Sequence, residues 1–220
     1  MKILHFFMFI CYFLFFTLTI LKMSFNEDFV YAEYMDDYYA TNPFYDLTKE
    51  QRLSLALLGL KAVLNDRDFM IFNNSLYFTQ KEKEHMYDVK ELLKMFFIIR
   101  DIAFFMFLIA FLICFLKYYD VNYLLKLLIK FHLLNVTILL ITLIFSAIFP
   151  RSVSLGLHYV LFYSKNNWRF GFWDLIVNIY PQRFWFNATI YFFTLSITLN
   201  IFYAIMLKYL KTIKSMTSNN

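Results

Sequence analysis

Four long apolar runs divide the chain, and each is long enough to cross a membrane as a helix. They cover residues 3–21, 95–116, 133–149 and 188–207. A bilayer core of about 30 Å needs about 20 apolar residues in helical form, and a helix is required because lipid offers no partners to unpaired backbone groups. The third run is short, but it carries no charge and stops at Pro150. The pattern predicts a mainly α, polytopic membrane protein with four transmembrane helices.

The lysines between these runs indicate which way the chain is threaded. Seven lysines but only one acidic residue, Asp120, lie in residues 1–2, 117–132 and 208–220, whereas residues 22–94 hold nine basic and thirteen acidic residues. Short loops rich in Lys and Arg stay in the cytoplasm. We therefore expect cytoplasmic termini, a cytoplasmic link at 117–132, a cytoplasmic tail at 208–220, and two outer loops at 22–94 and 150–187. The first run is interpreted as a retained anchor, because no small-residue cleavage site follows it.

Composition agrees with a membrane environment and excludes several classes of chemistry. Hydrophobic residues make up 61% of the chain and aromatic residues 23%. The three glycines complete no phosphate loop or nucleophile elbow, and no CxxC or HExxH pattern is present. Nothing resembles an aromatic RNA-binding signature. We expect no cofactor, no bound metal and no nucleic-acid partner, while the oligomeric state stays open.

The two outer loops are predicted to form a small extracytoplasmic domain. In the first loop, a helix is expected from Thr48 to Asn65, followed by a turn-like segment and then a strand within Asp66 to Phe78. A further helix begins at Gln80 and enters the second span. Ten residues separate His85 from Met95, which is about 15 Å of straight helix. An ester near the headgroups would then be out of reach. We therefore expect this helix to break or tilt, or Arg100 and Asp101 to lie deeper in a wet cavity, with the outer loops folded down over the membrane surface.

The predicted topology sorts the four histidines into two groups. His5 and His132 lie near the cytoplasmic ends of their spans, whereas His85 and His158 lie in the two outer loops. Only the outer pair can share a site, and a solvated or structurally hydrogen-bonded role is the plain alternative for each. Asp88, one helical turn beyond His85, is a candidate to orient its imidazole. A metal site built from His85, Asp88 and His158 is a further alternative.

Aromatic residues gather in the second outer loop. Trp168, Trp173 and Tyr159 are candidates to line a lipid-accessible substrate pocket. An aromatic belt at the headgroup level is the simpler interpretation, because Trp and Tyr prefer that depth in a membrane.

Two segments carry a resemblance to a known family. The stretch EKEHMYDVKELL spans Glu82 to Leu93, and LHYVLFYSKNNWRFGFWDLIVNIYPQRFWF spans Leu157 to Phe186. Both are similar to the signature segments of the lipoprotein intramolecular transacylase family of monoderm bacteria. The matching positions are Glu84, His85, Asp88, Val89, His158, Asn167, Trp168, Asp174, Leu175, Ile176 and Pro181. The order of four spans matches along the whole chain, although residues 22–77 align only loosely.

The resemblance implies an acyltransferase whose partners are diacylglyceryl-modified lipoproteins and membrane lipids. Such an enzyme moves the sn-2 acyl chain to the α-amino group of the same molecule's N-terminal cysteine, leaving a lyso-form lipoprotein. Amine and ester already share one molecule, so proximity supplies much of the rate and an acid and a base suffice. We assign His85 and His158 to an extracytoplasmic acid/base dyad. Asp88, Arg151 and Asn167 are candidates to orient it or to stabilise the oxyanion.

Two other classes of function stay open at this stage. A transporter or assembly factor would be non-enzymatic, but transport normally requires charges near the bilayer centre. Arg100 and Asp101 instead lie near the outer end of the second span. A lipid hydrolase could use Ser154 with His158, in which case water would accept the acyl chain.

Overall fold

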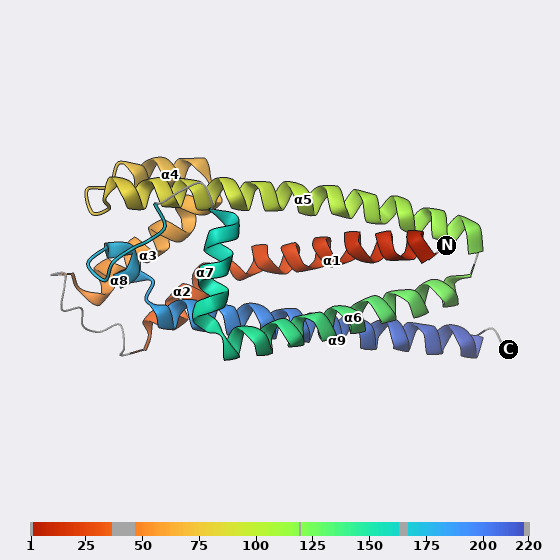
Figure 1. Cartoon of the computed structure of the whole chain (residues 1–220). Coiled ribbons are helices and arrows are strands. Elements are labelled where there is room, and N and C mark those ends of the chain that lie inside the picture. Colours follow the sequence, from red (N-terminus) through yellow and green to blue (C-terminus); the bar gives the residue numbers. More distant parts are fainter. Residues whose placement is uncertain (1, 37–46, 119, 163–166, 218–220) are drawn as a thin grey trace. The chain divides into compact units, whose positions relative to one another are not determined.

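The computed structural model describes residues 2–36, 47–118, 120–162 and 167–217, and the regular structure in those ranges is entirely helical. Figure 1 labels the helices α1 (Lys2–Ser24), α2 (Glu27–Tyr34), α3 (Lys49–Leu64), α4 (Asp66–Asn73), α5 (Gln80–Tyr118), α6 (Val121–Ile148), α7 (Pro150–Leu161), α8 (Leu175–Ile179) and α9 (Gln182–Thr217). Helices α1, α5, α6 and α9 are long and apolar enough to cross a membrane. The predicted class, a mainly α membrane protein with four spans, is confirmed.

The chain forms two compact units. The membrane unit comprises Met1–Lys22, Phe97–Ile148 and Tyr191–Asn220, and the loop unit comprises Met23–Phe96 and Phe149–Ile190. The membrane unit has an apolar core in which aromatic and small side chains interlock, made of Met8, Phe9, Tyr12, Ala110, Cys114, Leu124 and Phe131. Dispersion contacts of this kind are what hold helices together in lipid, where the hydrophobic effect is absent.

A buried polar network also joins three helices of the membrane unit. The hydroxyl of Tyr12 on α1 lies 2.5 Å from His132 Nδ1 on α6, and it donates to Asn200 Oδ1 on α9 at 3.2 Å. The Nδ2 of Asn135 donates to the same oxygen. Because α6 already begins at Val121, His132 lies well inside this helix, and residues 121–132 of the predicted link are helical. Interhelical hydrogen bonds such as these fix how neighbouring helices meet.

Local capping signals account for the helices of the loop unit. The side chain of Thr48 accepts from the backbone N–H of Gln51, whose own side chain accepts from Thr48 N–H. This capping box begins α3, which confirms the helix predicted from Thr48 to Asn65. The predicted turn and strand after it are wrong, because α4 occupies Asp66–Asn73. The Asn65 side chain caps α4 by accepting from Asp68 N–H, and this signal outweighs the β-prone run of apolar residues that follows it.

Helix α5 is continuous over 39 residues, so of the expected alternatives a break between His85 and Met95 is wrong, while a tilt or a deeper position of Arg100 and Asp101 stays a prediction. Its first part, residues 80–94, is rich in charge, and the apolar part begins at Met95. Helix α6 ends at Ile148, and Pro150 is the first residue of α7. At this position the N–H that proline lacks would have no partner within the helix, so no hydrogen bond is lost. Where each helix enters and leaves the membrane stays a prediction.

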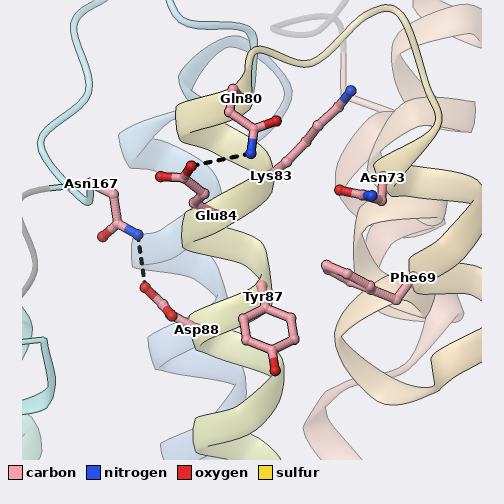
Figure 2. Close-up of a pocket in the computed structure, with 8 residues that line it drawn as sticks. All are labelled: Phe69, Asn73, Gln80, Lys83, Glu84, Tyr87, Asp88 and Asn167. Carbon is pink, nitrogen blue, oxygen red and sulfur yellow. Dashed lines mark hydrogen bonds between the residues drawn. The ribbon is translucent and has the colours of Figure 1, made fainter.

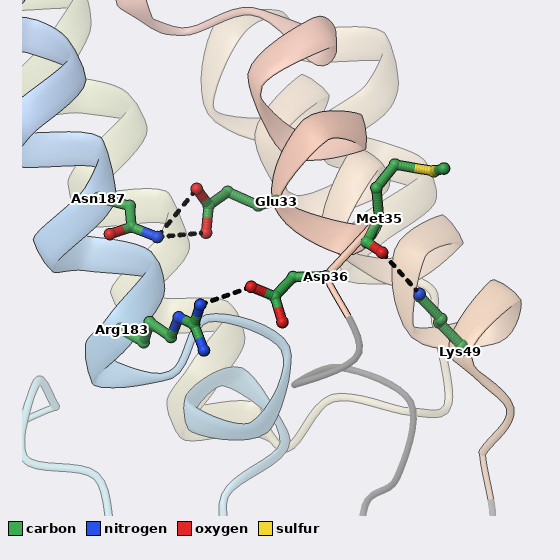
Figure 3. Close-up of polar contacts among 6 residues, drawn as sticks. All are labelled: Glu33, Met35, Asp36, Lys49, Arg183 and Asn187. Atoms are coloured by element: carbon green, nitrogen blue, oxygen red, sulfur yellow. Dashed lines mark hydrogen bonds and ion pairs between the residues drawn. The ribbon is translucent and has the colours of Figure 1, made fainter.

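Buried tyrosines and polar pairs lock the loop unit. Tyr34 on α2 donates to the carbonyl of Ile179 at 2.8 Å, and Tyr180 donates to the carbonyl of Ala56 on α3 at 2.5 Å. Figure 3 shows three further contacts around the end of α2, which pair Asn187 with Glu33, Arg183 with Asp36, and Lys49 with the carbonyl of Met35. The start of α9 is thereby tied to α2.

Gly59 gives a test of this packing. A Cβ added at Gly59 would lie 2.6 Å from the hydroxyl oxygen of the buried Tyr180. We expect Gly59→Ala to displace that ring and to lower stability by about 1–3 kcal/mol, seen as a lower Tm of the purified protein in detergent. The control is Gly156→Ala on α7, where nothing lies within 4 Å of the added atom; its Tm should stay the same or rise. Equal Tm values for the two variants would contradict this packing.

Candidate active site

The loop unit brings together the two histidines that the sequence singled out. His85 lies on α5 and His158 on α7, and their ring centroids are 6.3 Å apart with only 18° between the ring planes. Phe162 packs against both rings, at 5.2 Å from His85 and 5.8 Å from His158. The two imidazoles are thus close neighbours that share one aromatic contact. Their roles as catalytic residues stay a prediction at this point.

His85 is held in an apolar environment. It is only 7% exposed, and the edges or faces of Phe162 and Phe170 lie against its ring. Burial lowers its pKa to about 4, the positive charge of a protonated His158 and that of Lys81 act in the same direction, and Asp88 partly opposes them. The imidazole is therefore neutral at pH 7. Its Nδ1 is buried without a hydrogen-bond partner among the described residues, which is rare for a side chain with a purely structural role.

His158 has a different environment. It is half-buried, and its Nδ1 lies 2.8 Å from the backbone carbonyl of Ser154, one turn earlier on α7. A carbonyl oxygen only accepts, so Nδ1 carries the proton and the neutral ring keeps a free lone pair on Nε2. The ring of Trp168 packs against it at 5.2 Å. His158 is thus prepared to take up a proton at Nε2.

Hydrogen bonds hold the segment of residues 167–170 against α5. Asn167 Nδ2 donates to Asp88 Oδ2 at 2.7 Å, and the ammonium of Lys81 donates to the carbonyl of Arg169. The guanidinium of Arg169 bonds the hydroxyl of Tyr159 and lies over the ring of Trp168. Between these anchors, Trp168 packs on His158 and Phe170 packs on His85. The segment therefore forms the aromatic wall of the site.

Glu82 is a structural residue of this site that the sequence reasoning missed. It is fully buried, and one carboxylate oxygen accepts from the backbone N–H of Ile176 at 2.7 Å. The other accepts from the N–H and the hydroxyl of Thr79. The signal was present in the sequence, because Thr79 and Glu82 have the spacing of a capping box. Glu82 thus starts α5 one turn before His85 and ties α8 to it.

Two pockets meet on the face of α5 near the histidines. The Glu84 pocket, about 650 Å³, is lined by Phe69, Asn73, Gln80, Lys83, Glu84, Tyr87, Asp88 and Asn167 (Figure 2). The Leu92 pocket, about 260 Å³, is lined by Tyr87, Asp88, Glu91, Leu92, Met95, Leu161 and Phe162. Tyr87 and Asp88 belong to both pockets, and Phe162 links the Leu92 pocket to the two histidine rings.

The other predicted site residues lie at differing distances from the histidine pair. Asp88 and Asn167 bond each other, while Trp168 and Tyr159 pack together beside His158. Arg151 is exposed in the first turn of α7, seven residues and about 10 Å along the helix from His158. Trp173 is 63% exposed and stacks on Phe172. Tyr159, Trp168 and Trp173 are not among the described residues that line either pocket.

The geometry of the described residues bears on two alternative kinds of site, a metal site and a serine nucleophile paired with His158. Within the described ranges, no group of three or more His, Cys, Asp or Glu side chains is arranged to hold a metal ion. Ser154 contacts His158 through its backbone carbonyl, and this bond occupies the Nδ1 of the ring. A serine hydroxyl activated through that nitrogen therefore has no support in the geometry.

Known proteins are similar to this chain in sequence and in fold. The family model of the lipoprotein intramolecular transacylase Lit matches residues 5–185. An uncharacterized protein of Aquifex aeolicus (strain VF5) is 30% identical over 186 residues, which cover 82% of each chain. The in meso structure of the membrane integral lipoprotein intramolecular transacylase Lit from Bacillus cereus aligns with a TM-score of 0.63 at 18% identity, covering 98% of this chain and 97% of that one. With most of its length matched by the family model, the chain belongs to the lipoprotein intramolecular transacylase family.

Proposed function

We propose that this membrane acyltransferase moves the sn-2 acyl chain of a diacylglyceryl lipoprotein to the α-amino group of the same molecule's N-terminal cysteine. The product is a lyso-form lipoprotein. The observation that carries the proposal is the close approach of His85 and His158, two imidazoles in different environments with a shared apolar neighbour, Phe162. Family membership supplies the class of reaction.

The two environments suggest which histidine does what. The free Nε2 lone pair of His158 suits the base that removes a proton from the attacking amine, whose pKa is about 8. The amine nitrogen bonds to the ester carbonyl carbon, and a tetrahedral oxyanion forms. The proton taken up by His158 leaves with the sn-2 oxygen as the C–O bond breaks. His85, neutral at pH 7, relays it: one ring nitrogen accepts a proton while the other donates its own to the departing oxygen, so that no imidazolate forms and no net proton is consumed.

The Leu92 pocket supports a route for the acyl chain. Most of its lining residues are apolar, with Asp88 and Glu91 as the charged exceptions, and those on α5 extend from Tyr87 to Met95, where the predicted span begins. This stretch covers most of the 15 Å that separates His85 from the predicted membrane boundary. An acyl chain that rises through the pocket keeps apolar contact while its ester reaches the histidines. No break in α5 is needed for this path.

The predicted topology bears on the side of the membrane where the reaction takes place. The lysine distribution favours cytoplasmic termini, which puts the loop unit on the extracytoplasmic side, where lipoproteins are displayed. Asn167 and Arg151 stay candidates for binding the oxyanion. The amide of Asn167 is already engaged with Asp88 in the structure, so its contribution would require that bond to shift.

Variants of the two histidines test the dyad. His158→Asn preserves a donor near the Nδ1 position, so the bond to the Ser154 carbonyl is retained while the Nε2 base is lost. We expect this variant and His85→Asn to fold and to lose conversion by about 10²–10⁴-fold, measured in cells by mass spectrometry of lipoprotein N-terminal peptides. The control is His5→Ala, whose ring bonds Tyr123 in the membrane unit, and it should retain conversion.

The same spectra separate the rival functions. Release of free fatty acid without N-acylation would indicate a hydrolase, and unmodified diacyl substrate in wild-type cells would indicate a non-enzymatic protein. Full conversion by both histidine variants would refute the dyad.

The depressed pKa of His85 predicts a pH dependence of stability. Its pKa is about 4 in the folded chain against 6.5 in the unfolded one, so the unfolded state binds more protons between these values. The free energy of unfolding therefore falls as the pH drops from about 6.5 towards 4, by about 2 kcal/mol at pH 5. Thermal unfolding of wild type and His85→Asn at pH 7 and pH 5 checks this. The fall in Tm should be smaller in the variant, and equal falls would contradict a buried neutral His85.

A further inference from the structure

The Glu84 pocket is the larger of the two described pockets, and neither histidine of the proposed dyad is among its described lining residues. It begins where the Leu92 pocket ends, at Tyr87 and Asp88, and extends toward the N-terminal end of α5 at Gln80. In Figure 2, Asn73 and Phe69 reach from α4 toward α5 on one side, and Asn167 bonds Asp88 on the other. The described lining of the pocket thus comes from α4, from α5 and from Asn167.

The side chains of this pocket suit a polar ligand that is neutral or cationic. Glu84 is exposed, and its carboxylate accepts from the side chain of Gln80 at 3.1 Å. Asp88, Asn73 and Asn167 add further hydrogen-bonding groups, and Lys83 is the single cation among the described residues of the lining. An acyl chain would leave these groups without partners. A phosphate would meet two carboxylates.

We propose that the Glu84 pocket binds the polypeptide that follows the acylated cysteine of the substrate. This inference rests on the proposed function. The substrate cysteine carries its lipid through sulfur and its polypeptide through the carbonyl carbon, so the two must leave the reacting amine in different directions. If the acyl chain occupies the Leu92 pocket, the polypeptide can occupy the Glu84 pocket, which lies on the other side of Tyr87 and Asp88.

The properties of the pocket match an extended peptide. Its volume lies within the usual range of ligand sites, and its amide side chains offer both donors and acceptors to a peptide backbone. The exposed carboxylate of Glu84 favours a Lys or Arg side chain among the first residues after the cysteine. The pocket would thereby select among lipoproteins and hold the amine close to His158.

Synthetic diacyl lipopeptides that differ only in two Lys or two Glu residues after the cysteine test this site. Purified wild-type protein in detergent should convert the Lys peptide with a kcat/KM about two- to fivefold higher, as expected for exposed charge pairs. Glu84→Gln should bring the ratio close to one, and Glu84→Lys should invert it. Glu50→Gln, which removes an exposed carboxylate from the first turn of α3, is the matched control and should keep the wild-type ratio.

A second variant tests the shape of the site. Asn73→Trp narrows the pocket and should raise KM for both peptides, but not for diacylglyceryl-cysteine amide, which lacks a polypeptide. A Lys/Glu ratio that stays the same in wild type, Glu84→Gln and Glu84→Lys would overturn the peptide site while leaving the transacylase proposal intact. If wild type converts none of the lipopeptides, both the proposed function and this inference fail.

Discussion

The carboxylate of Glu82 is fully buried and accepts hydrogen bonds from two segments of chain nearly 100 residues apart, at Thr79 and Ile176. Burying a carboxylate costs several kcal/mol unless its oxygens accept hydrogen bonds. The Glu82 side chain must therefore stay where Thr79 and the Ile176 N–H can donate to it. It defines the start of α5, and therefore where His85 lies, and it also fixes the N-terminal turn of α8. The segment that precedes α8 carries Trp168 and Phe170 to the histidines. One buried group thus sets the register of both halves of the site.

Within that frame, two chemically identical side chains acquire different properties. His85 is enclosed by aromatic rings and stays neutral. His158 donates its Nδ1 proton to a backbone carbonyl, which leaves the lone pair of Nε2 able to accept a proton. Enzymes commonly divide acid and base roles between like residues through such differences of environment. In the proposed reaction this division needs no metal or covalent nucleophile, because the proposed substrate already contains the attacking amine and the ester.

The character of α5 changes along its length in the same order as the proposed substrate. Its first turns are charged and border the Glu84 pocket, its middle carries Tyr87 and Asp88, and the Leu92 pocket leads down to the apolar part at Met95. A lipoprotein is likewise polar in its peptide and apolar in its acyl chains. An unbroken helix is sufficient for the proposed arrangement, because the α5 residues that line the Leu92 pocket extend over most of the distance between His85 and the predicted membrane boundary at Met95.

The sequence alone determined the elements whose signals are local. Apolar runs marked the four membrane-crossing helices, the Thr48 cap marked α3, and the pairing of His85 with His158 followed from counting spans and from a family resemblance. Helix α4 was missed because a polar cap at Asn65 competed with a β-prone run. The Glu82 cap had a visible signal, but its bond to Ile176 did not.

Tertiary structure alone decided the contacts between distant positions: His132 with Tyr12 and Asn200, Asn167 with Asp88, and Phe162 between the two histidines. These depend on which faces of separate helices meet, and that is set by packing over the whole chain and not by any local pattern.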